Sequence, residues 1–317
     1  MIVGPYNEDM KRAIRQAFLG AFELEYITSR EEYCRLANAD YAIVRTLSFT
    51  AEDIAWMTKI KLIHRWGAGY DTVDIEAAAK RGIPVAVNYG MNATPVSEMT
   101  LALTLAVYRN LVPMNEGVQI GRWEREKYAS RSYTVSGKCV GLIGIGNIGR
   151  KVAALYQAFG ASVYYYNIRR RTLEEEAALG VTYSKLDDLW GKCDIISLHA
   201  PLADETYRIV NGDTISKMKD GAVLINTSRE ELVDSHALAE SLKSGKLLGA
   251  GLDAIEEHIL TDNPFSGLDN IVLTAHVGGN TVDNVEQMAN RCAEQILAVS
   301  RGEKLQPPYV VNTHLFG

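Results

Sequence analysis

Short apolar runs alternate with longer segments of helical period along most of the chain. The runs are rich in Val, Ile and Tyr and lie at residues 41–45, 84–88, 194–199, 222–227 and 271–276. A short continuous apolar run is typical of a strand buried on both faces, and helices between such strands cover the faces of a parallel sheet. The pattern therefore predicts an α/β fold with parallel sheets.

Two helical segments indicate how the chain is divided. Residues 97–112 are almost continuously apolar, which predicts a buried helix that could connect two α/β units, and Ser97 is suited to be its N-cap. In the last helical segment, residues 285–300, apolar side chains recur at helical spacing. They are Val285, Met288, Cys292, Ile296 and Val299. This second helix must pack on another element.

The length and composition of the chain agree with two domains. It has 317 residues, of which 47% are hydrophobic and 23% are charged, enough for two sizeable cores. The formal net charge is -6, so the chain has no excess of positive charge that would attract nucleic acid or an anionic membrane. Neither is an expected partner. No apolar stretch reaches the ~18 residues that span a bilayer, and the first residues do not form a signal peptide. We therefore expect a cytoplasmic protein.

The cysteines do not indicate a metal site. They are spread along the sequence at Cys34, Cys139, Cys193 and Cys292. Because they form no C-x-x-C pair, neither a zinc site nor a disulfide framework is predicted. We expect buried, reduced thiols and no bound metal.

The first motif with a chemical meaning is G-x-G-x-x-G, formed by Gly144, Gly146 and Gly149. It directly follows the apolar run 140–143 and opens a helical segment, which is the context of a dinucleotide-binding turn. The first glycine allows a tight turn, the second lets the backbone approach a pyrophosphate, and the third lets helix and strand pack closely. An ordinary glycine-rich turn is the alternative, but the strand before it and the helix after it favour a cofactor site.

The next predicted strand ends in Asn167, at about the 20-residue distance from Gly149 where an Asp or Glu usually binds the ribose 2'-hydroxyl of NAD. A carboxylate would repel the 2'-phosphate of NADP, whereas Asn167 is neutral and Arg169 or Arg170 can bind a phosphate. We therefore predict that these three residues bind the cofactor and that NADPH is preferred over NADH. The alternative is a surface helix with solvated charges, an interpretation that we favour for Arg171 only.

Several further motifs follow in a fixed order. They are "GAGYDTVDIEAAAKRGIPVAVNYGMNATPVSE", "GLIGIGNIGR", "SLHAPLADET", "LINTSREELVDSHALAESLKSGKLLGAGLDA" and "LTAHVGGNT". With them, the sequence resembles the D-2-hydroxyacid dehydrogenase family over nearly its full length. The resemblance implies two Rossmann-like, doubly wound parallel-sheet domains: a flavodoxin-like substrate domain of residues 1–96 and 286–317, and an NAD(P)-binding Rossmann domain of residues 97–285. It also implies a homodimer through the cofactor domain, with residues 121–123 in the segment that packs across the interface.

Reduction of a 2-keto acid needs an acid for the carbonyl oxygen and a cation for the carboxylate. His276 ends an apolar run at an edge where ligands bind in open α/β sheets, and the resemblance of "TAHVGGNT" makes it the general acid rather than a satisfied strand-end histidine. The resemblance likewise makes Arg229, after "LINTS", the substrate-binding catalytic arginine, with a surface arginine as the alternative. In the family the substrate carboxylate also meets the N–H groups of a glycine loop, which here is Gly67, Ala68 and Gly69.

The resemblance implies further cofactor contacts. They are made by the backbone amides of Asn147 and Ile148, by His199, Pro201 and Thr227, by Asp253 at the nicotinamide amide, and by Gly278. For His199, a packed histidine at a strand end is the alternative. The expected cofactor is NADP, with NAD as the second choice.

Two positions depart from the family pattern. Glu230 and Glu231 follow Arg229, where the family usually has Gly, and we expect them to add negative charge near an anionic substrate. The family also places a Glu, which holds the catalytic histidine, five residues after the aspartate that corresponds to Asp253. Here that position is His258. Either a shift by one residue brings Glu257 to His276, or His276 pairs with His258, which would disfavour its protonated form.

Three functions remain open from the sequence. The first is an NADP-preferring reductase of small 2-keto acids such as glyoxylate or hydroxypyruvate. The second is a dinucleotide-sensing protein on the same scaffold with little catalysis, which the departure at His258 favours and the presence of Arg229 and His276 opposes. The third keeps the enzyme class and changes the substrate to 3-phosphoglycerate, formate or phosphite.

Overall fold

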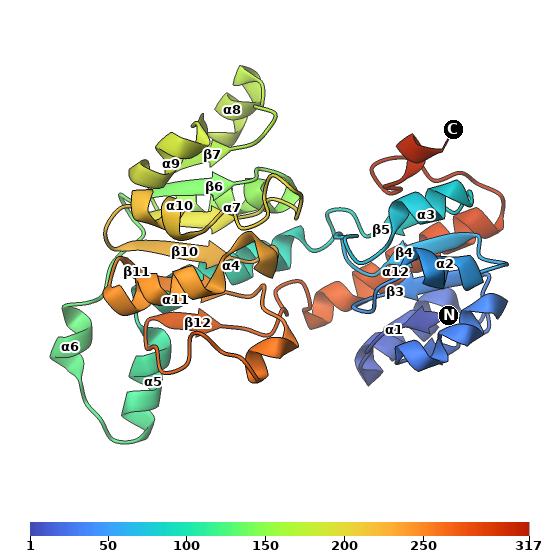
Figure 1. Ribbon diagram of the computed structural model, residues 1–317, viewed down its shortest axis with the longest axis horizontal. Coiled ribbons are helices and arrows are strands. Elements are labelled where there is room, and N and C mark those ends of the chain that lie inside the picture. The colour runs from blue at the N-terminus through green and yellow to red at the C-terminus, as the bar shows by residue number, and fades with distance from the viewer. Residues whose placement is uncertain (317) are drawn as a thin grey trace. The chain divides into compact units, whose positions relative to one another are not determined.

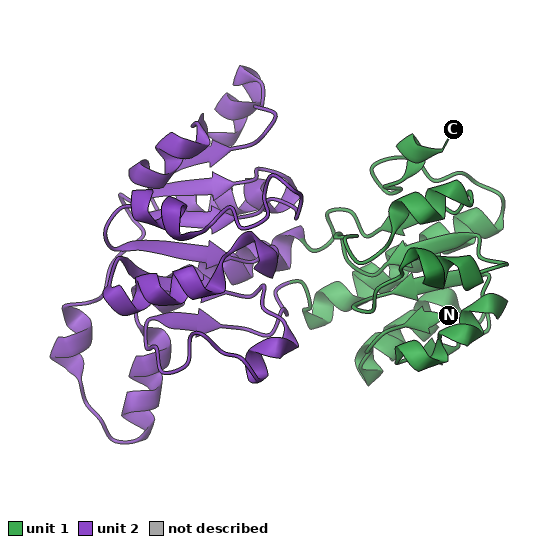
Figure 2. Ribbon diagram, in the orientation of Figure 1, with its two compact units in different colours: residues 1–92, 279–317 green, residues 93–278 purple. Residues whose placement is uncertain are grey.

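The computed structural model describes residues 1–316, which form two compact units (Figures 1 and 2). The first unit comprises Met1–Asn92 and Gly279–Gly317, and the second comprises Ala93–Gly278. The chain leaves the first unit at α4 (Ala93–Tyr108) and returns to it just before α12 (Val282–Ser300). The domain boundaries predicted from the sequence fall inside these two helices, whereas the units divide at residues that precede them.

The first unit is built on a five-stranded parallel sheet with the order β2-β1-β3-β4-β5. This is the order of a flavodoxin-like, doubly wound sheet. Its strands are β1 (Ile2–Val3), β2 (Tyr26–Ile27), β3 (Tyr41–Val44), β4 (Leu62–Arg65) and β5 (Val85–Val87). Its helices are α1 (Glu8–Phe18), η1 (Arg30–Asn38), α2 (Ala51–Trp56), α3 (Ile75–Lys80), α12 and η4 (Thr313–Leu315).

The last long helix packs in the core of this first unit. Asn7 caps α1 by accepting a hydrogen bond from Met10 N at 2.9 Å, which starts that helix at Glu8. The buried side chains of α1 and α12 then share one hydrophobic cluster; they include Met10, Ile14 and Phe18 from α1 and Val285, Met288, Cys292 and Ile296 from α12. The prediction that residues 285–300 pack on another element is confirmed.

The second unit is built on a seven-stranded parallel sheet with the order β12-β11-β10-β9-β6-β7-β8, which reverses between β6 and β9 as in a Rossmann fold. Its strands are β6 (Cys139–Ile143), β7 (Ser162–Tyr166), β8 (Thr182–Tyr183), β9 (Ile195–Leu198), β10 (Ala222–Asn226), β11 (Leu247–Leu252) and β12 (Ile271–Leu273). Its helices are α4, α5 (Leu111–Gln119), α6 (Arg125–Ala129), α7 (Asn147–Ala158), α8 (Leu173–Leu179), α9 (Leu186–Lys192), α10 (Gly212–Lys217), η2 (Glu230–Leu232), α11 (Ser235–Ser244) and η3 (Glu257–Leu260). In Figure 1 the arrowheads of this sheet point to one edge.

Successive residues of the central strands are buried on opposite faces of this second sheet. Ile195 and Val223 belong to the cluster that also contains side chains of α4 and α7, whereas Ile196 and Leu224 belong to the cluster that contains side chains of α9, α10 and α11. A strand that is buried on both faces has a continuous apolar run in its sequence. All five runs identified in the sequence contain a strand, so the predicted parallel α/β architecture is confirmed.

The connecting helix differs from its prediction at both ends. It begins at Ala93, so Ser97 lies inside it and donates its hydroxyl to Thr94 O at 2.7 Å instead of capping the first turn. It ends at Tyr108, because Asn110 adopts a left-handed conformation (φ of 50°) and α5 begins at the next residue. None of the helices in residues 1–316, this apolar one included, has the length and hydrophobicity needed to cross a membrane.

Candidate active site

The turn between β6 and α7 places the three glycines of the motif at the carboxyl edge of the second sheet. Gly144 has a φ of +101°, and a Cβ there would lie 2.6 Å from Ala200 N. A Cβ on Gly149 would lie 2.3 Å from Gly144 O. At Gly146, by contrast, an added Cβ would have no described atom within 4 Å. The first and third glycines are thus required by packing, while the second leaves the backbone open.

The N-terminus of α7 faces this open position. The helix begins at Asn147, and in the described part of the chain no side chain caps it. The backbone N–H groups of Asn147 and Ile148 therefore belong to the first turn, where amides have no partner within the helix and where the helix dipole favours an anion. The turn fits the pyrophosphate of a dinucleotide.

Asn167 follows β7 and holds the same turn. Its Oδ1 accepts a hydrogen bond from Ile145 N at 2.9 Å. The exposed Ile168 and Arg169 come next, so no carboxylate stands at the end of this strand. Arg169 has no hydrogen bond or ion pair with any of residues 1–316.

Arg170 is engaged with α8. Its Nε lies 2.7 Å from Oε1 of Glu176 and its Nη2 lies 2.8 Å from Oε2, which makes the pair bidentate. The guanidinium also lies over the ring of Tyr183. The hydrogen bonds from Arg170 lower the pKa of the buried Glu176 carboxyl to about 2. Of the two arginines predicted to bind a 2'-phosphate, Arg169 therefore has the unpaired charge.

Arg171 packs against the glycine-rich turn, so its interpretation as a merely solvated side chain is wrong. Its Nη2 donates to Ile145 O at 3.3 Å. Arg171 and Arg150 both approach Oε1 of Glu175, at 3.5 and 3.3 Å, and the Nε atoms of both arginines are buried without a hydrogen-bond partner in the described residues. Two guanidinium groups share one carboxylate here, so this corner of the site is positive and suits an anionic cofactor.

His199, Pro201 and Thr227 lie on the strand ends next to this turn. His199 is largely buried, with Nε2 2.8 Å from Ser197 Oγ, and burial lowers its pKa to about 3. It therefore stays neutral at physiological pH and cannot act as an acid there. The Pro201 carbonyl accepts a hydrogen bond from Thr206 Oγ1 at 2.7 Å, and the Thr227 hydroxyl lies 3.0 Å from that of Thr100.

Asp253 organises the loop that carries His276. Its Oδ1 accepts hydrogen bonds from Thr274 Oγ1 at 2.6 Å and from Val277 N at 3.0 Å, and its Oδ2 accepts one from Gly278 N at 2.8 Å. A Cβ on Gly278 would lie 2.7 Å from this second oxygen, so a glycine is needed there. The loop leaves β12 at Leu273, and His276 adopts a φ of +51°, a conformation that non-glycine residues adopt rarely and that often marks functional sites.

The acid partner of His276 is Glu256. Its Oε1 lies 3.0 Å from Nδ1 of the ring. Neither alternative from the sequence is therefore right, because the partner is neither Glu257 nor His258. The third residue after Asp253 meets the histidine instead of the fifth, which lies inside η3. The sensor hypothesis was favoured because no acid was assigned to His276. Since Glu256 lies beside the ring, that reason no longer holds.

Arg229 lies just after β10, at the same edge of the sheet. Asn226 at the strand end fixes the turn by donating Nδ2 to Arg229 O at 2.7 Å. The hydrogen bond with His276 lowers the pKa of Glu256, and the charge of Arg229 lowers it further. The structure thus brings Arg229, Glu256 and His276 together as a cation, a carboxylate and an imidazole.

Glu230 has a role that sequence reasoning missed. Its Oε1 lies 3.1 Å from Nε2 of His258, and its Oε2 accepts a hydrogen bond from Glu256 N at 3.1 Å. The two departures from the family pattern therefore contact each other. Their opposite charges were the only signal in the sequence that could have suggested this pairing.

The predicted substrate loop belongs to the first unit. Gly67, Ala68 and Gly69 follow β4 at its carboxyl end and are half-buried. Asn88 N donates to Gly67 O at 3.1 Å and Arg65 Nε donates to Gly69 O at 2.8 Å, so two of the three carbonyls are bound.

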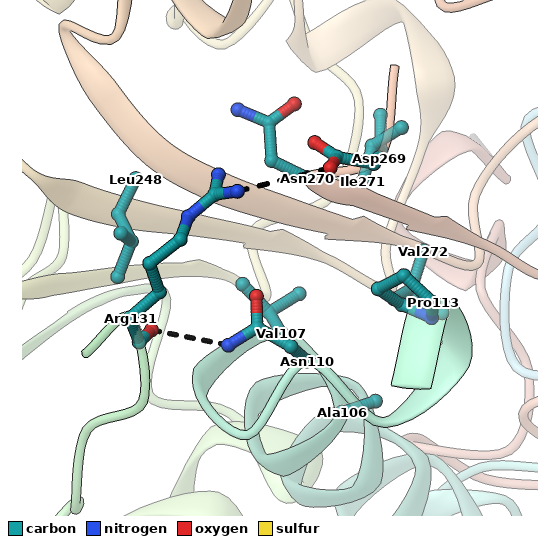
Figure 3. Close-up of a pocket in the computed structure, with 10 residues that line it drawn as sticks. All are labelled: Ala106, Val107, Asn110, Pro113, Arg131, Leu248, Asp269, Asn270, Ile271 and Val272. Carbon is teal, nitrogen blue, oxygen red and sulfur yellow. Dashed lines mark hydrogen bonds and ion pairs between the residues drawn. The ribbon is translucent and has the colours of Figure 1, made fainter. Parts of the chain in front are cut away.

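A separate cavity lies between the end of α4, the start of α5 and strands β11 and β12 (Figure 3). Arg131 lies beside it and approaches Asp269 at 3.8 Å, while Asn110 Nδ2 donates to Arg131 O at 3.0 Å. Its volume is about 10 Å³, which is room for a water molecule at most. It is not a candidate for the substrate site.

Comparison with known proteins extends the similarity beyond the glycine-rich turn. Residues 101–278 match the family model described as D-isomer specific 2-hydroxyacid dehydrogenase, NAD binding domain. The chain is 36% identical over 289 residues to a glyoxylate reductase from Thermofilum pendens, a match that covers 90% of this chain and 85% of that protein. It is 34% identical over 298 residues to a hydroxypyruvate reductase from Thermotoga maritima, covering 92% and 95% of the two chains.

Solved structures show the same extent of similarity. A D-lactate dehydrogenase from Aquifex aeolicus, complexed with NAD and lactic acid, matches with a TM-score of 0.88 at 28% identity. The match covers 98% of each chain, so it includes residues of both units.

Proposed function

The chain belongs to the D-isomer-specific 2-hydroxyacid dehydrogenase family, and from this premise we propose that it reduces small 2-keto acids, glyoxylate and hydroxypyruvate foremost, with a nicotinamide dinucleotide. The observation that carries the proposal is the Glu256–His276 pair beside Arg229 at the carboxyl edge of the second sheet. An acid held by a carboxylate and a cation nearby are what carbonyl reduction requires of the protein.

The side chains divide this work. A bound nicotinamide dinucleotide would supply the hydride. His276, with Nδ1 held by Glu256, donates a proton from Nε2 to the carbonyl oxygen. Arg229 binds the substrate carboxylate and polarises the carbonyl.

The cofactor residues follow from the glycine-rich turn. We assign the pyrophosphate to the backbone of Gly144, Gly146, Asn147, Ile148 and Gly149, because Gly146 leaves the approach open and α7 starts there. Further cofactor contacts are assigned to residues at the neighbouring strand ends. They are His199, Pro201, Thr227, Asp253 and Gly278.

Within this site we propose a preference for NADPH. Asn167 is neutral and Arg169 is exposed beside it with an unpaired charge, so a 2'-phosphate meets no carboxylate at the strand end. Arg170 is a weaker candidate than Arg169, because Glu176 already occupies two of its nitrogen atoms. Arg171 and Arg150 add positive charge but hold the turn, so they serve both dinucleotides equally.

We further propose that the protein forms a homodimer through the second unit. The stretch from α5 to α6 has exposed apolar side chains, including Val118 at 55%, Ile120 at 65% and Trp123 at 78% exposure. In Figure 1 these helices extend away from the sheet of their unit. Large apolar side chains exposed on one segment are typical of a protein–protein interface. In a twofold dimer the same segment of a second copy packs against it.

A cytoplasmic location is the last part of the proposal. All four cysteines are free. Cys193 and Cys292 are buried as expected, whereas the expectation is wrong for Cys34, which is exposed, and for Cys139, which is only partly buried. Free thiols are usual in a reducing compartment.

A histidine variant tests the proposed chemistry. His276→Gln should abolish keto-acid reduction while fluorescence titration shows unchanged binding of the dinucleotide. His236→Gln is the matched control, because His236 is an exposed histidine in the same unit. Equal turnover by the two variants would remove His276 from the mechanism.

A further inference from the structure

A second carboxylate–imidazole pair lies next to the first. Glu230 Oε1 lies 3.1 Å from His258 Nε2, as Glu256 Oε1 lies 3.0 Å from His276 Nδ1. The two pairs are joined, because the other oxygen of Glu230 accepts the hydrogen bond of Glu256 N at 3.1 Å. Glu230 therefore uses one oxygen for each of two neighbours.

Glu230 is the least exposed member of this chain of contacts. Its side chain is 15% exposed, whereas those of Glu256 and His258 are 61% and 60% exposed. It begins η2 directly after Arg229, whose carbonyl is fixed by Asn226 at the end of β10. A partly buried carboxylate on a fixed turn can anchor a more exposed segment.

The segment that carries Glu256 is attached to the β10 side at two points. Near its start, Asp253 N and Ala254 N donate to Asn226 O at 2.9 and 3.3 Å. At its end, Glu256 N donates to Glu230. If the second attachment is lost, the Glu256 end of the segment is free to move, and the carboxylate that holds His276 moves with it.

We propose that Glu230 and His258 are positioning residues for the acid site. Glu230 fixes the backbone of Glu256 so that its carboxylate stays on His276, and His258 balances the charge of Glu230 beside Arg229. This inference rests on the proposed reductase function. The charged groups that face Glu230 are His258, Glu256 and Glu231; those that face Glu256 are His276, Arg229 and His258.

The test combines NMR of the histidine ring signals at constant pH with steady-state kinetics. Glu230→Ala removes both the charge and the acceptor for Glu256 N, whereas Glu230→Gln keeps an oxygen acceptor. The matched control is Glu231→Gln, because Glu231 is exposed and its backbone carbonyl, which the substitution keeps, accepts the hydrogen bond from Arg208 N. The His276 ring signal is assigned from its loss in His276→Gln.

In Glu230→Ala, the His276 ring signals should move at constant pH, because the Glu256 carboxylate no longer stays beside Nδ1. The kcat should fall roughly 10- to 100-fold while the KM of the dinucleotide is unchanged, since a small displacement of an acid has effects of this size. Glu230→Gln should recover most of the kcat. His258→Gln should raise the KM of the keto acid roughly two- to fivefold, as expected for loss of an exposed contact.

Unmoved ring signals of His276 in Glu230→Ala would overturn the proposal, as would a loss of kcat shared by Glu231→Gln. If Glu230→Ala does not fold, Glu230→Asp takes its place, because the shorter side chain cannot reach Glu256 N and His258 together. Absence of keto-acid turnover in the wild type would contradict the proposed function alone, because the ring signals still decide whether Glu230 positions Glu256.

Discussion

The Glu256–His276 pair makes the most direct prediction. Replacing Glu256 by Gln keeps the size of the side chain and an oxygen that can accept from Nδ1, but it removes the negative charge. The carboxylate supports proton donation from the ring to the carbonyl oxygen, and an uncharged amide does not give this electrostatic support. The kcat/KM of the keto acid should therefore fall in this variant.

The size of this loss follows from the distance and the exposure. Two unit charges 3.0 Å apart interact with about 1.4 kcal/mol at the dielectric constant of water. The value for water applies because 61% of the Glu256 side chain and 42% of the His276 side chain are exposed, and exposed pairs are screened. This energy corresponds to roughly a tenfold loss of kcat/KM.

The assay is steady-state oxidation of NADPH with hydroxypyruvate at neutral pH. Glu257→Gln is the matched control, since Glu257 is the adjacent exposed acid in the same segment. An equal loss of kcat/KM in Glu257→Gln, or an unchanged kcat/KM in Glu256→Gln, would refute the assigned pair.

Three further predictions concern the cofactor, the stability and the assembly. Arg169→Ala should raise the KM of NADPH roughly 10- to 150-fold, the effect of one charge-assisted hydrogen bond, and leave the KM of NADH unchanged. Arg171→Ala is the control, for which we expect equal losses with both cofactors. Equal losses in Arg169→Ala would contradict the assignment. The depressed pKa of Glu176, about 2 against an ordinary 4.5, means that its pair with Arg170 stabilises the fold fully above about pH 4.5 and that this stability is lost as the pH falls toward 2. The Tm of Glu176→Gln should therefore lie below that of the wild type at neutral pH and converge with it in acid, and a difference independent of pH would argue against this. Trp123→Ser should sediment as a monomer where the wild type sediments as a dimer, and an unchanged mass would remove Trp123 from the interface.

The elements that could be predicted from the sequence are those set by local chemistry. The run at 222–227 becomes β10 because Leu224 and its neighbours are buried on both faces of the sheet. The glycine motif was readable for the same reason: Gly144 needs a positive φ, and Gly149 has no room for a Cβ. In each case the residue and the constraint on it lie within a few positions of each other.

The partners of the charged residues could not be predicted in the same way. Glu256, Glu257 and His258 are adjacent in sequence, and only the path of the segment before η3 decides which of them meets His276. Likewise, the sequence predicts that Arg170 can bind a phosphate, but in the structure its charge is paired with Glu176 of α8. A shift of one or two residues along a loop changes which charged side chains meet. The sequence alone does not determine the path of a loop to within one or two residues.

The central claim, reduction of small 2-keto acids with a preference for NADPH, is tested most directly by the kinetics of the wild-type protein. Oxidation of NADPH and of NADH would be followed with glyoxylate, hydroxypyruvate, pyruvate and bulkier 2-keto acids, and the reverse reaction with 3-phosphoglycerate, formate and phosphite. The account predicts turnover of the small keto acids with a higher kcat/KM for NADPH. Tight binding of either dinucleotide without turnover of any of these keto acids would contradict it.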